Sequence, residues 1–146
     1  MKREIITTAD GSKTIYLPEW DEHYHSKHGA IQEAYHVFIE MGLDFLIQKN
    51  VQNFHILEIG FGTGLNAFIT FLEAKKSGFL VDYTGIEAFP VSNEEIATLK
   101  YAEDLSLPEE IEIFKKMHQV DWEEVQEISL PIGNIRYYNA RCKMED

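Results

Sequence analysis

Hydrophobic residues recur at helical spacing between residues 29 and 49 of the chain. Steps of three and four residues place them on one face of a helix. The predicted inward stripe consists of Ile31, Ala34, Tyr35, Phe38, Met41, Phe45 and Leu46. Gly42 weakens this helix locally, and Asn50 is its expected end. Before the helix, strand-forming residues on both sides of Asp10-Gly11 predict a β-hairpin from Glu4 to Leu17.

Strand-like and helix-like segments alternate after residue 50. Three core strands are predicted, at His55–Ile59, Leu80–Glu87 and Ile135–Tyr138. Helices are predicted at Leu65–Lys76, from Ser92 to about Ala102, and from Pro108 onward with Ile111, Phe114 and Met117 apolar. Ser92 and Glu95 form a capping box, and Gly78 is the expected end of the first of these helices. Asp121-Trp122-Glu123-Glu124 is expected to cap a short helical turn that contains Val125.

This alternation predicts an α/β fold with a parallel sheet and right-handed crossovers. The 146 residues suffice for one domain with a sizeable core. No apolar run reaches the roughly 18 residues of a membrane span, and the first residues lack the apolar core of a signal peptide. A single cysteine, Cys142, excludes an internal disulfide and is typical of a reducing cytoplasm. We therefore expect a cytoplasmic protein that makes no membrane contact.

The net charge of −12 narrows the possible partners. Nucleic-acid binding rests largely on contacts between Lys or Arg and phosphates, so this surface repels RNA. Any RNA substrate would need a local basic patch or basic surface from another domain or partner. The acidity does not oppose a positively charged small ligand.

The strongest chemical signal is the segment from His55 to Asn66. An apolar strand ends near Glu58, and Gly60, Gly62 and Gly64 follow at alternate positions before a helix begins. Glycines allow positive φ and remove the Cβ that would keep a ligand away from the backbone. A strand, glycine turn and helix in this order bind the polar part of a nucleotide-like cofactor at the carboxyl end of a sheet.

The glycine spacing helps to choose the cofactor. The dinucleotide pattern G-x-G-x-x-G would need its third glycine at Leu65, and a P-loop would need Lys after its last glycine. No Lys or Arg lies between Asn50 and Lys75, so no cation is ready for a pyrophosphate. A cofactor without phosphate is favoured over NAD(P), although an NAD(P)-binding oxidoreductase and a glycine-rich turn in an unrelated α/β domain remain alternatives.

Two carboxylates and one amide accompany the turn. Glu87 ends the second predicted strand, where a carboxylate can accept hydrogen bonds from two ribose hydroxyls. Glu58 could bind a cofactor ammonium, or it could hold the glycine loop by accepting backbone N–H bonds. Asn66 could be a helix cap or a contact to a cofactor carboxylate.

The glycine turn also carries a family resemblance. Glu-x-Gly-x-Gly-x-Gly from Glu58 to Gly64 resembles the first motif of Rossmann-like S-adenosylmethionine methyltransferases. Gly-Phe-Gly-Thr-Gly-Leu-Asn, with Phe61 inside it, is much narrower. Together with Tyr24-His25-Ser26, Gly29–Ala34 and His36–Ile39 upstream, it resembles the methyltransferase domain of the bacterial tRNA wobble-uridine modification family MnmC. The resemblance spans roughly Pro18 to Glu87, with weaker support to Asn139.

The resemblance implies a fold, a cofactor and a substrate. It implies an N-terminal hairpin and helix followed by the first half of a Rossmann-like class I methyltransferase sheet. In one domain, residues 1–20 would form the hairpin extension, 21–50 the helical segment and 51–146 the cofactor-binding part. The reaction would be methyl transfer from S-adenosylmethionine to an aminomethyl group on C5 of uridine 34 in tRNA. The chain resembles the stand-alone methyltransferase form, without the FAD-dependent oxidase domain of fused members.

The family resemblance also defines the predicted site. The cofactor-binding residues are expected to be Glu58, Gly60, Phe61, Gly62, Gly64, Asn66, Glu87 and Asn139. No catalytic residue is assigned, because the family's Asp-Ala-Phe-x-Pro-like segment has no counterpart here. Ala88-Phe89-Pro90 is similar only superficially and lies at the ribose position. The chain is thus expected to be incomplete relative to the family.

Two further expectations concern assembly and metals. Three core strands leave unpaired sheet edges, so the second hypothesis is a noncatalytic cofactor-binding or scaffold fragment that forms a homodimer or joins a partner completing the sheet. We expect no metal. His25 and His28 are one helical step apart, but no carboxylate or Cys set completes a site, and with His23 they are expected in a solvated loop or the substrate mouth.

Overall fold

The first 23 residues form a small antiparallel sheet. The computed structural model describes residues 1–51, 53–105, 108–119, 125–130 and 133–139. Strands β1 (Glu4–Thr7) and β2 (Lys13–Leu17) form the predicted hairpin, and the two-residue strand β3 (Glu22–His23) pairs with β2 on the other side. The predicted hairpin is confirmed, and β3 extends it by one strand.

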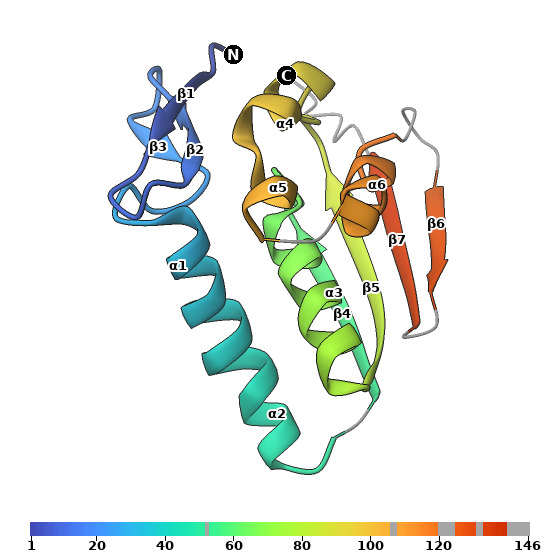
Figure 1. Cartoon of the computed structure of the whole chain (residues 1–146). Coiled ribbons are helices and arrows are strands. Elements are labelled where there is room, and N and C mark those ends of the chain that lie inside the picture. The colour runs from blue at the N-terminus through green and yellow to red at the C-terminus, as the bar shows by residue number, and fades with distance from the viewer. Residues whose placement is uncertain (52, 106–107, 120–124, 131–132, 140–146) are drawn as a thin grey trace, which may run out of the picture.

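A long helical path follows the hairpin sheet (Figure 1). It comprises α1 (Ala30–Ala34), the π-helical segment η1 (Tyr35–Leu43) and α2 (Asp44–Gln48). Asn50 has a φ of 61°, consistent with the predicted end. The predicted inward stripe is correct in the first half and wrong in the second.

The π-helical segment explains the error in the helix face. Met41 and Phe45, predicted to face inward, are 66% and 51% exposed, and Leu46 is also exposed. A π-helix has i→i+5 hydrogen bonds and more residues per turn than an α-helix, so the buried face advances differently along the sequence. The buried positions Ile39 and Leu43 follow this wider turn.

The central sheet has four described strands. They are β4 (Asn53–Ile59), β5 (Leu80–Glu87), β6 (Val125–Leu130) and β7 (Gly133–Asn139), in the order β4-β5-β7-β6. β4, β5 and β7 are parallel, which confirms the α/β prediction, and β6 is antiparallel to β7. Val125 therefore begins a strand rather than lying in a helical turn. The turn expected at residues 121–124, like Cys142, lies outside the described residues.

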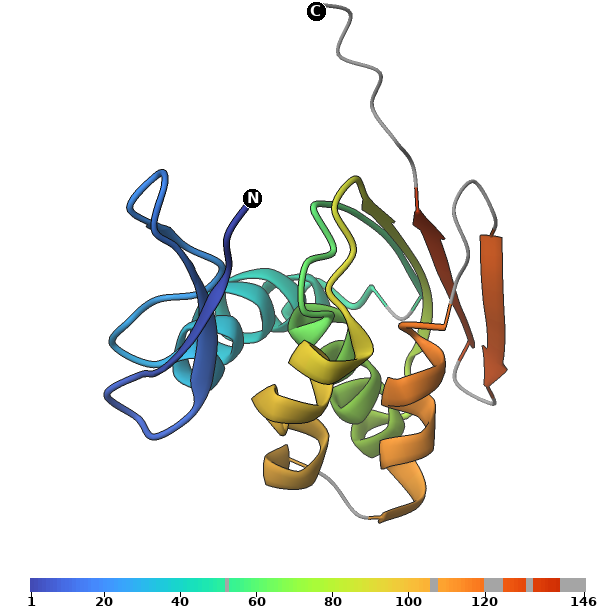
Figure 2. The ribbon, with the colours of Figure 1, turned by 90° about the horizontal axis from the view of Figure 1, so that it is seen from above.

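The remaining helices cover one face of this sheet (Figure 2). They are α3 (Leu65–Ser77), α4 (Asn93–Leu99), α5 (Tyr101–Leu105) and α6 (Pro108–Lys116). Phe68 and Ile69 of α3 are fully buried. The Ser92–Glu95 capping box is present, but its helix ends at Leu99 because Lys100 is left-handed, with a φ of 60°. None of the described helices has the length and apolarity that a membrane span requires.

The β4 side of the sheet is open. Among the described strands β4 is an edge, and its residues Leu57 and Ile59 are 64% and 73% exposed. An apolar hollow of about 330 Å³ lies between this strand and the long helix, lined by residues such as Leu43 and Phe54. The described residues do not cover this apolar surface.

Polar contacts fasten the N-terminal sheet to the segment after β5. Arg3 Nη1 donates to Pro90 O at 3.0 Å, and Lys13 Nζ donates to Thr98 O at 2.8 Å. The Tyr101 hydroxyl donates to the Lys13 carbonyl. These bonds hold the N-terminal residues over the carboxyl ends of β4 and β5, where the glycine turn lies.

Candidate functional site

The glycine turn connects β4 to α3. Gly60, Gly62 and Gly64 all have positive φ, at 85°, 55° and 69°. The N–H groups of Gly60 and Phe61 donate to the Ile86 carbonyl at 2.9 and 3.0 Å, which binds the turn to the end of β5. The turn therefore adopts the backbone conformation that its sequence predicts.

At two of these positions a side chain would also be crowded by neighbouring rings. A Cβ at Gly62 would lie 3.2 Å from the Tyr24 ring, and a Cβ at Gly64 would lie 2.8 Å from the Phe61 ring and 3.0 Å from the His118 ring. Phe61 itself is 3% exposed, and its ring packs under the turn against Gly85 in the middle of β5. Phe61 thus supports the turn as well as lining the cavity described below.

Glu87 joins the turn to the end of β5. Its Oε2 accepts a hydrogen bond from the Gly62 N–H at 2.6 Å, and its Oε1 accepts one from the Phe89 N–H at 2.7 Å. Only 7% of the residue is exposed. Each carboxylate oxygen has a second lone pair, so Glu87 can hold the turn and still accept a ligand hydroxyl.

Glu58 has different partners from those anticipated. Asn66 Nδ2 donates to its Oε1 at 2.9 Å, and the Tyr83 hydroxyl donates to its Oε2 at 2.8 Å. Burial raises the pKa of Glu58, and the two hydrogen bonds oppose that rise. No backbone N–H bond to Glu58 is seen among the described residues, so the role of holding the loop passes to Glu87.

Asn66 is not a helix cap. The N-cap of α3 is Gly64, with no capping side chain, and Asn66 is turned toward Glu58. The cap interpretation of Asn66 is therefore wrong, because a glycine already occupies the position before the first helical turn.

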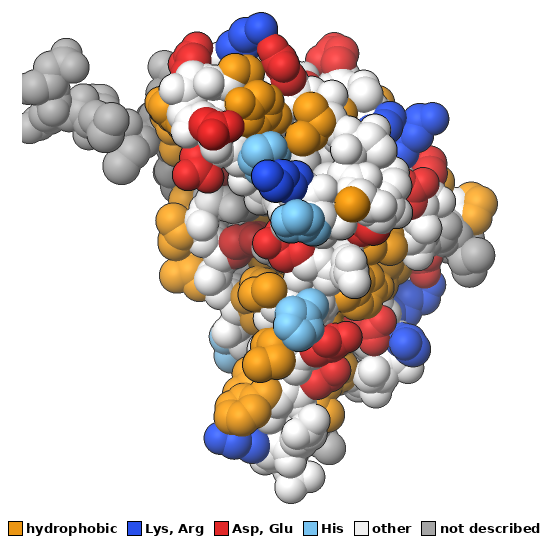
Figure 3. All heavy atoms as spheres, turned by 90° about the vertical axis from the view of Figure 1, so that its left-hand side faces the viewer, with side chains coloured by type: hydrophobic (Ala, Val, Ile, Leu, Met, Phe, Trp, Pro, Cys, Tyr) orange, Lys and Arg blue, Asp and Glu red, His pale blue; other side chains and the backbone are white. Residues whose placement is uncertain are grey.

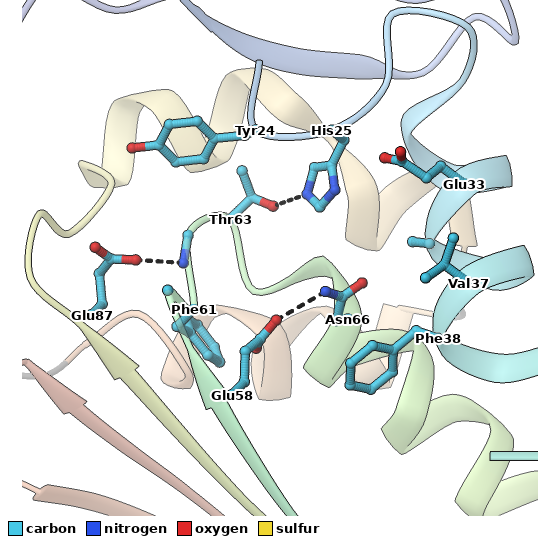
Figure 4. Close-up of a pocket in the computed structure, with 13 residues that line it drawn as sticks. Tyr24, His25, Glu33, Val37, Phe38, Glu58, Phe61, Thr63, Asn66 and Glu87 are labelled. Carbon is cyan, nitrogen blue, oxygen red and sulfur yellow. Dashed lines mark hydrogen bonds between the residues drawn. The ribbon is translucent and has the colours of Figure 1, made fainter. Parts of the chain in front are cut away.

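A cavity of about 450 Å³ opens at this turn. Such a volume is typical of small-molecule sites. One wall comes from the turn region, with Glu58, the glycine loop, Asn66 and Glu87. The opposite wall comes from the N-terminal region, and Figure 4 shows its side chains facing the turn: Tyr24, His25, Glu33, Val37 and Phe38.

Of this second wall, the sequence associated only His25 with a ligand, through the alternative that the histidines lie at the substrate mouth. Tyr24 and His25 belong to a segment that carried the family resemblance, as do Glu33, Val37 and Phe38. Their position within the resembling segments was the available signal. Their contact with the cavity depends on how the N-terminal region docks.

Two histidines hold Thr63 in the glycine turn. His25 Nε2 lies 2.8 Å from Thr63 Oγ1, and His118 Nε2 lies 3.1 Å from the Thr63 carbonyl oxygen. Burial lowers the pKa of His25 to about 4 and also lowers the pKa of His118. Both imidazoles are therefore neutral at physiological pH. The second nitrogen of His118 faces the Phe114 carbonyl oxygen at 2.9 Å, so the neutral ring donates to only one of its two carbonyl neighbours.

The charge of the cavity is one-sided. Among the residues that the structure describes, its lining contains the carboxylates of Glu33, Glu58 and Glu87 and no Lys or Arg. A ligand that carries positive charge and sugar hydroxyls suits this lining, whereas a pyrophosphate would be repelled. Within the described residues, no three His, Cys, Asp or Glu side chains converge as metal ligands would.

Asn139 is positioned by its backbone. It is the last residue of β7 and lies in register with Glu87, at the same end of the sheet as the glycine turn. Its contact with a cofactor stays a prediction, as do the ligand contacts of the other proposed site residues.

A parallel sheet whose first strand ends in a glycine turn, and whose second ends in a carboxylate, defines a Rossmann-like α/β domain. No family model matches the chain. In structure it is similar to MnmC2 from Aquifex aeolicus, with a TM-score of 0.62, 22% identity, and coverage of 97% of this chain and 43% of that one. That likeness confirms the fold.

Sequence similarity points to a particular family. The chain is 38% identical over 98 residues to the tRNA 5-methylaminomethyl-2-thiouridine biosynthesis bifunctional protein MnmC of Leptospira interrogans, and 39% identical over 97 residues to that of Delftia acidovorans. Each match covers 63% of this chain, but only 15% and 14% of the relatives. The resemblance to the methyltransferase domain of MnmC is thereby confirmed, and the chain spans a small part of these relatives' length.

Proposed function

We propose that this chain binds S-adenosylmethionine and belongs to a methyltransferase that acts on an aminomethyl group of the tRNA wobble uridine. The observation that carries the proposal is the acidic cavity at the glycine turn. It combines three carboxylates, a turn open to close backbone approach and no Lys or Arg among the described residues of its lining. These features suit a sulfonium nucleoside without phosphate.

The residues of the turn wall fit the parts of this cofactor. Glu87, at the end of β5, would accept hydrogen bonds from the ribose hydroxyls. Glu58 would attract the methionine ammonium, and Asn66, hydrogen-bonded to Glu58, would meet the methionine carboxylate. When bound, the cofactor supplies an electrophilic methyl group. The protein's part is to orient the reactants and exclude water, which the two-walled cavity supports.

The substrate proposal rests on the relatives. The chain matches proteins from different bacteria that are named for the biosynthesis of 5-methylaminomethyl-2-thiouridine in tRNA. The net charge of −12 means that this chain would depend on a basic partner or domain to hold the tRNA backbone. We place this activity in the cytoplasm, where tRNA is modified.

Calorimetric titration tests cofactor binding. We expect saturable binding of S-adenosylmethionine and S-adenosylhomocysteine and none of NAD. Glu87→Gln should weaken both by about tenfold, because a charged acceptor is replaced by a neutral one at the ribose. Glu94→Gln, which removes an exposed carboxylate on α4, is the control and should change nothing. Binding of NAD instead, or no binding by a folded sample, would overturn the proposal.

A second candidate function has structural support of its own. The exposed Leu57 and Ile59 side chains on edge strand β4 favour a noncatalytic cofactor-binding fragment that pairs with a second copy. Light scattering on the purified chain distinguishes the cases. A dimer that Leu57→Glu converts to a monomer, with no methylation of unmethylated tRNA, would favour this candidate over the first.

A further inference from the structure

A separate space, the outer hollow, adjoins the cavity at the glycine turn. Its volume is about 410 Å³, and it is lined by residues 21–28 together with Glu33. Three residues, Tyr24, His25 and Glu33, line both spaces and so form the wall between them. Figure 3 shows the face on which this region lies, where histidine, lysine and acidic side chains gather over the N-terminal part of the molecule.

The three shared residues differ in charge. Burial lowers the pKa of His25 to about 4 and raises that of Tyr24, so both side chains are neutral at physiological pH. Glu33 is the carboxylate of this wall. A cation that enters the outer hollow and approaches the cofactor cavity would therefore meet Glu33.

Glu33 is held in place while one oxygen stays available. The Ser26 N–H donates to its Oε2 at 2.7 Å, which fixes the side chain against the loop before α1. Within the described part of the chain, Oε1 accepts no hydrogen bond. Figure 4 shows the carboxylate extending from α1 toward His25 and the glycine turn.

We propose that the outer hollow admits the methyl acceptor, a primary amine, and that Glu33 receives its ammonium group at the boundary with the cofactor cavity. The proposal rests on the proposed function, since it places the second reactant beside the first. It also assigns the acceptor side of the site to the N-terminal region of this chain.

Methyl transfer at Glu33 needs no reactant besides the amine and the cofactor. The ammonium gives one proton to the carboxylate and becomes a neutral amine with a free electron pair. That pair forms the new N–C bond to the methyl group, while the S–C bond breaks and its electrons stay on sulfur. The methylated nitrogen then carries the positive charge, and Glu33 returns its proton to water as the product leaves.

Binding measurements test this role without depending on turnover. The chain is saturated with S-adenosylhomocysteine, which carries no transferable methyl group, and titrated with 5-aminomethyluridine. We expect Glu33→Gln to weaken binding of this nucleoside by about tenfold, because a charge-assisted hydrogen bond is lost. The amide oxygen can still accept from the Ser26 N–H, so the loop should keep its position.

Two controls separate the role of Glu33 from general effects. Glu40→Gln removes an equal charge from the same helical path, where Glu40 is exposed and lines neither space, and it should leave nucleoside binding unchanged. Binding of uncharged 5-methyluridine and of S-adenosylhomocysteine should change less than about twofold in Glu33→Gln.

The outcomes distinguish the two proposals. If S-adenosylhomocysteine does not bind, the proposed function fails and this inference falls with it. If it binds, but 5-aminomethyluridine does not bind or binds Glu33→Gln as well as the unaltered chain, the assignment of Glu33 is wrong while cofactor binding stands.

Discussion

The two walls of the cavity at the glycine turn are built in different ways. The turn wall belongs to the continuous unit β4–α3–β5, and its carboxylates are already hydrogen-bonded to the backbone or to neighbouring side chains. The N-terminal wall comes from a separate sheet and helix and presents side chains, among them Tyr24, His25 and Glu33. The turn wall is thus preorganised by local structure, whereas the other wall is assembled by docking.

This difference predicts different consequences of mutation. The turn wall lies directly over buried residues such as Phe61 and Leu65, so damage there should reduce stability and binding together. The N-terminal wall reaches the turn through polar contacts such as His25–Thr63. Changes in that wall should alter ligand preference and pH response while the sheet remains folded.

The largest expected effect is at Gly64 in the turn wall. Gly64→Ala places a Cβ within 2.8 Å of the Phe61 ring and 3.0 Å of the His118 ring, at a φ of 69°. Left-handed strain costs about 1 kcal/mol and overpacking typically adds 1–3 kcal/mol, so we expect the free energy of unfolding to fall by about 3 kcal/mol. Denaturant unfolding measures the change.

Gly78 provides a matched control at the other end of α3. It has a φ of 77°, but a Cβ there would meet nothing within 4 Å, so Gly78→Ala should cost only the strain of about 1 kcal/mol. Equal losses in the two variants would show that packing of Phe61 and His118 against the turn is unimportant.

The second prediction concerns His25 and acid. Burial lowers its pKa in the folded protein to about 4, below the unfolded value near 6.5. Between these values the unfolded chain binds more protons, so the stability contributed by neutral His25 is complete above pH 6.5 and is lost as pH falls toward 4. The loss should be about 3 kcal/mol at most.

Comparison of variants isolates this histidine from the carboxylates that also titrate. His25→Gln should flatten the fall in unfolding free energy between pH 6.5 and 4. His36→Gln should not, because His36 is exposed and pairs with Glu40 on the helix surface. A slope that persists in His25→Gln would mean that His25 is not the group responsible.

The two walls also differ in how much of their structure the sequence predicts. The turn wall follows from local rules: glycines at positive φ, an apolar strand before them and a helix after them. Its elements were predictable because each is specified by neighbours within a few residues. Glu87 was predictable by its position, but its bond to Gly62 was not, because it joins residues 25 apart in the sequence.

Tertiary structure accounts for what the sequence did not show. Because the π-helical segment shifts the buried face of the helix, Met41 and Phe45 are exposed, although the sequence predicted that they face inward. β6 was missed because its pairing with β7 outweighs the local helical signal near Val125. The position of Tyr24 and Glu33 in the lining of the cavity depends on contacts such as Arg3–Pro90. These contacts dock the N-terminal sheet, and no local sequence pattern predicts them.

The smallest predicted effect lies within the turn wall, at the buried Tyr83. Its hydroxyl donates to Glu58 and opposes the pKa rise that burial causes. Tyr83→Phe removes one hydrogen bond and should lower the free energy of unfolding by about 1 kcal/mol. It should also raise the pKa of Glu58 further, so binding of S-adenosylmethionine should weaken at a higher pH on acidification than in the unaltered chain. Calorimetric titrations across pH measure this shift.

Tyr16→Phe, which loses a surface hydrogen bond to Asp21, is the control and should leave the pH profile of cofactor binding unchanged. Identical profiles for all three proteins would show that Glu58 does not attract the cofactor's charge, and the turn wall would then act through its backbone and Glu87 alone.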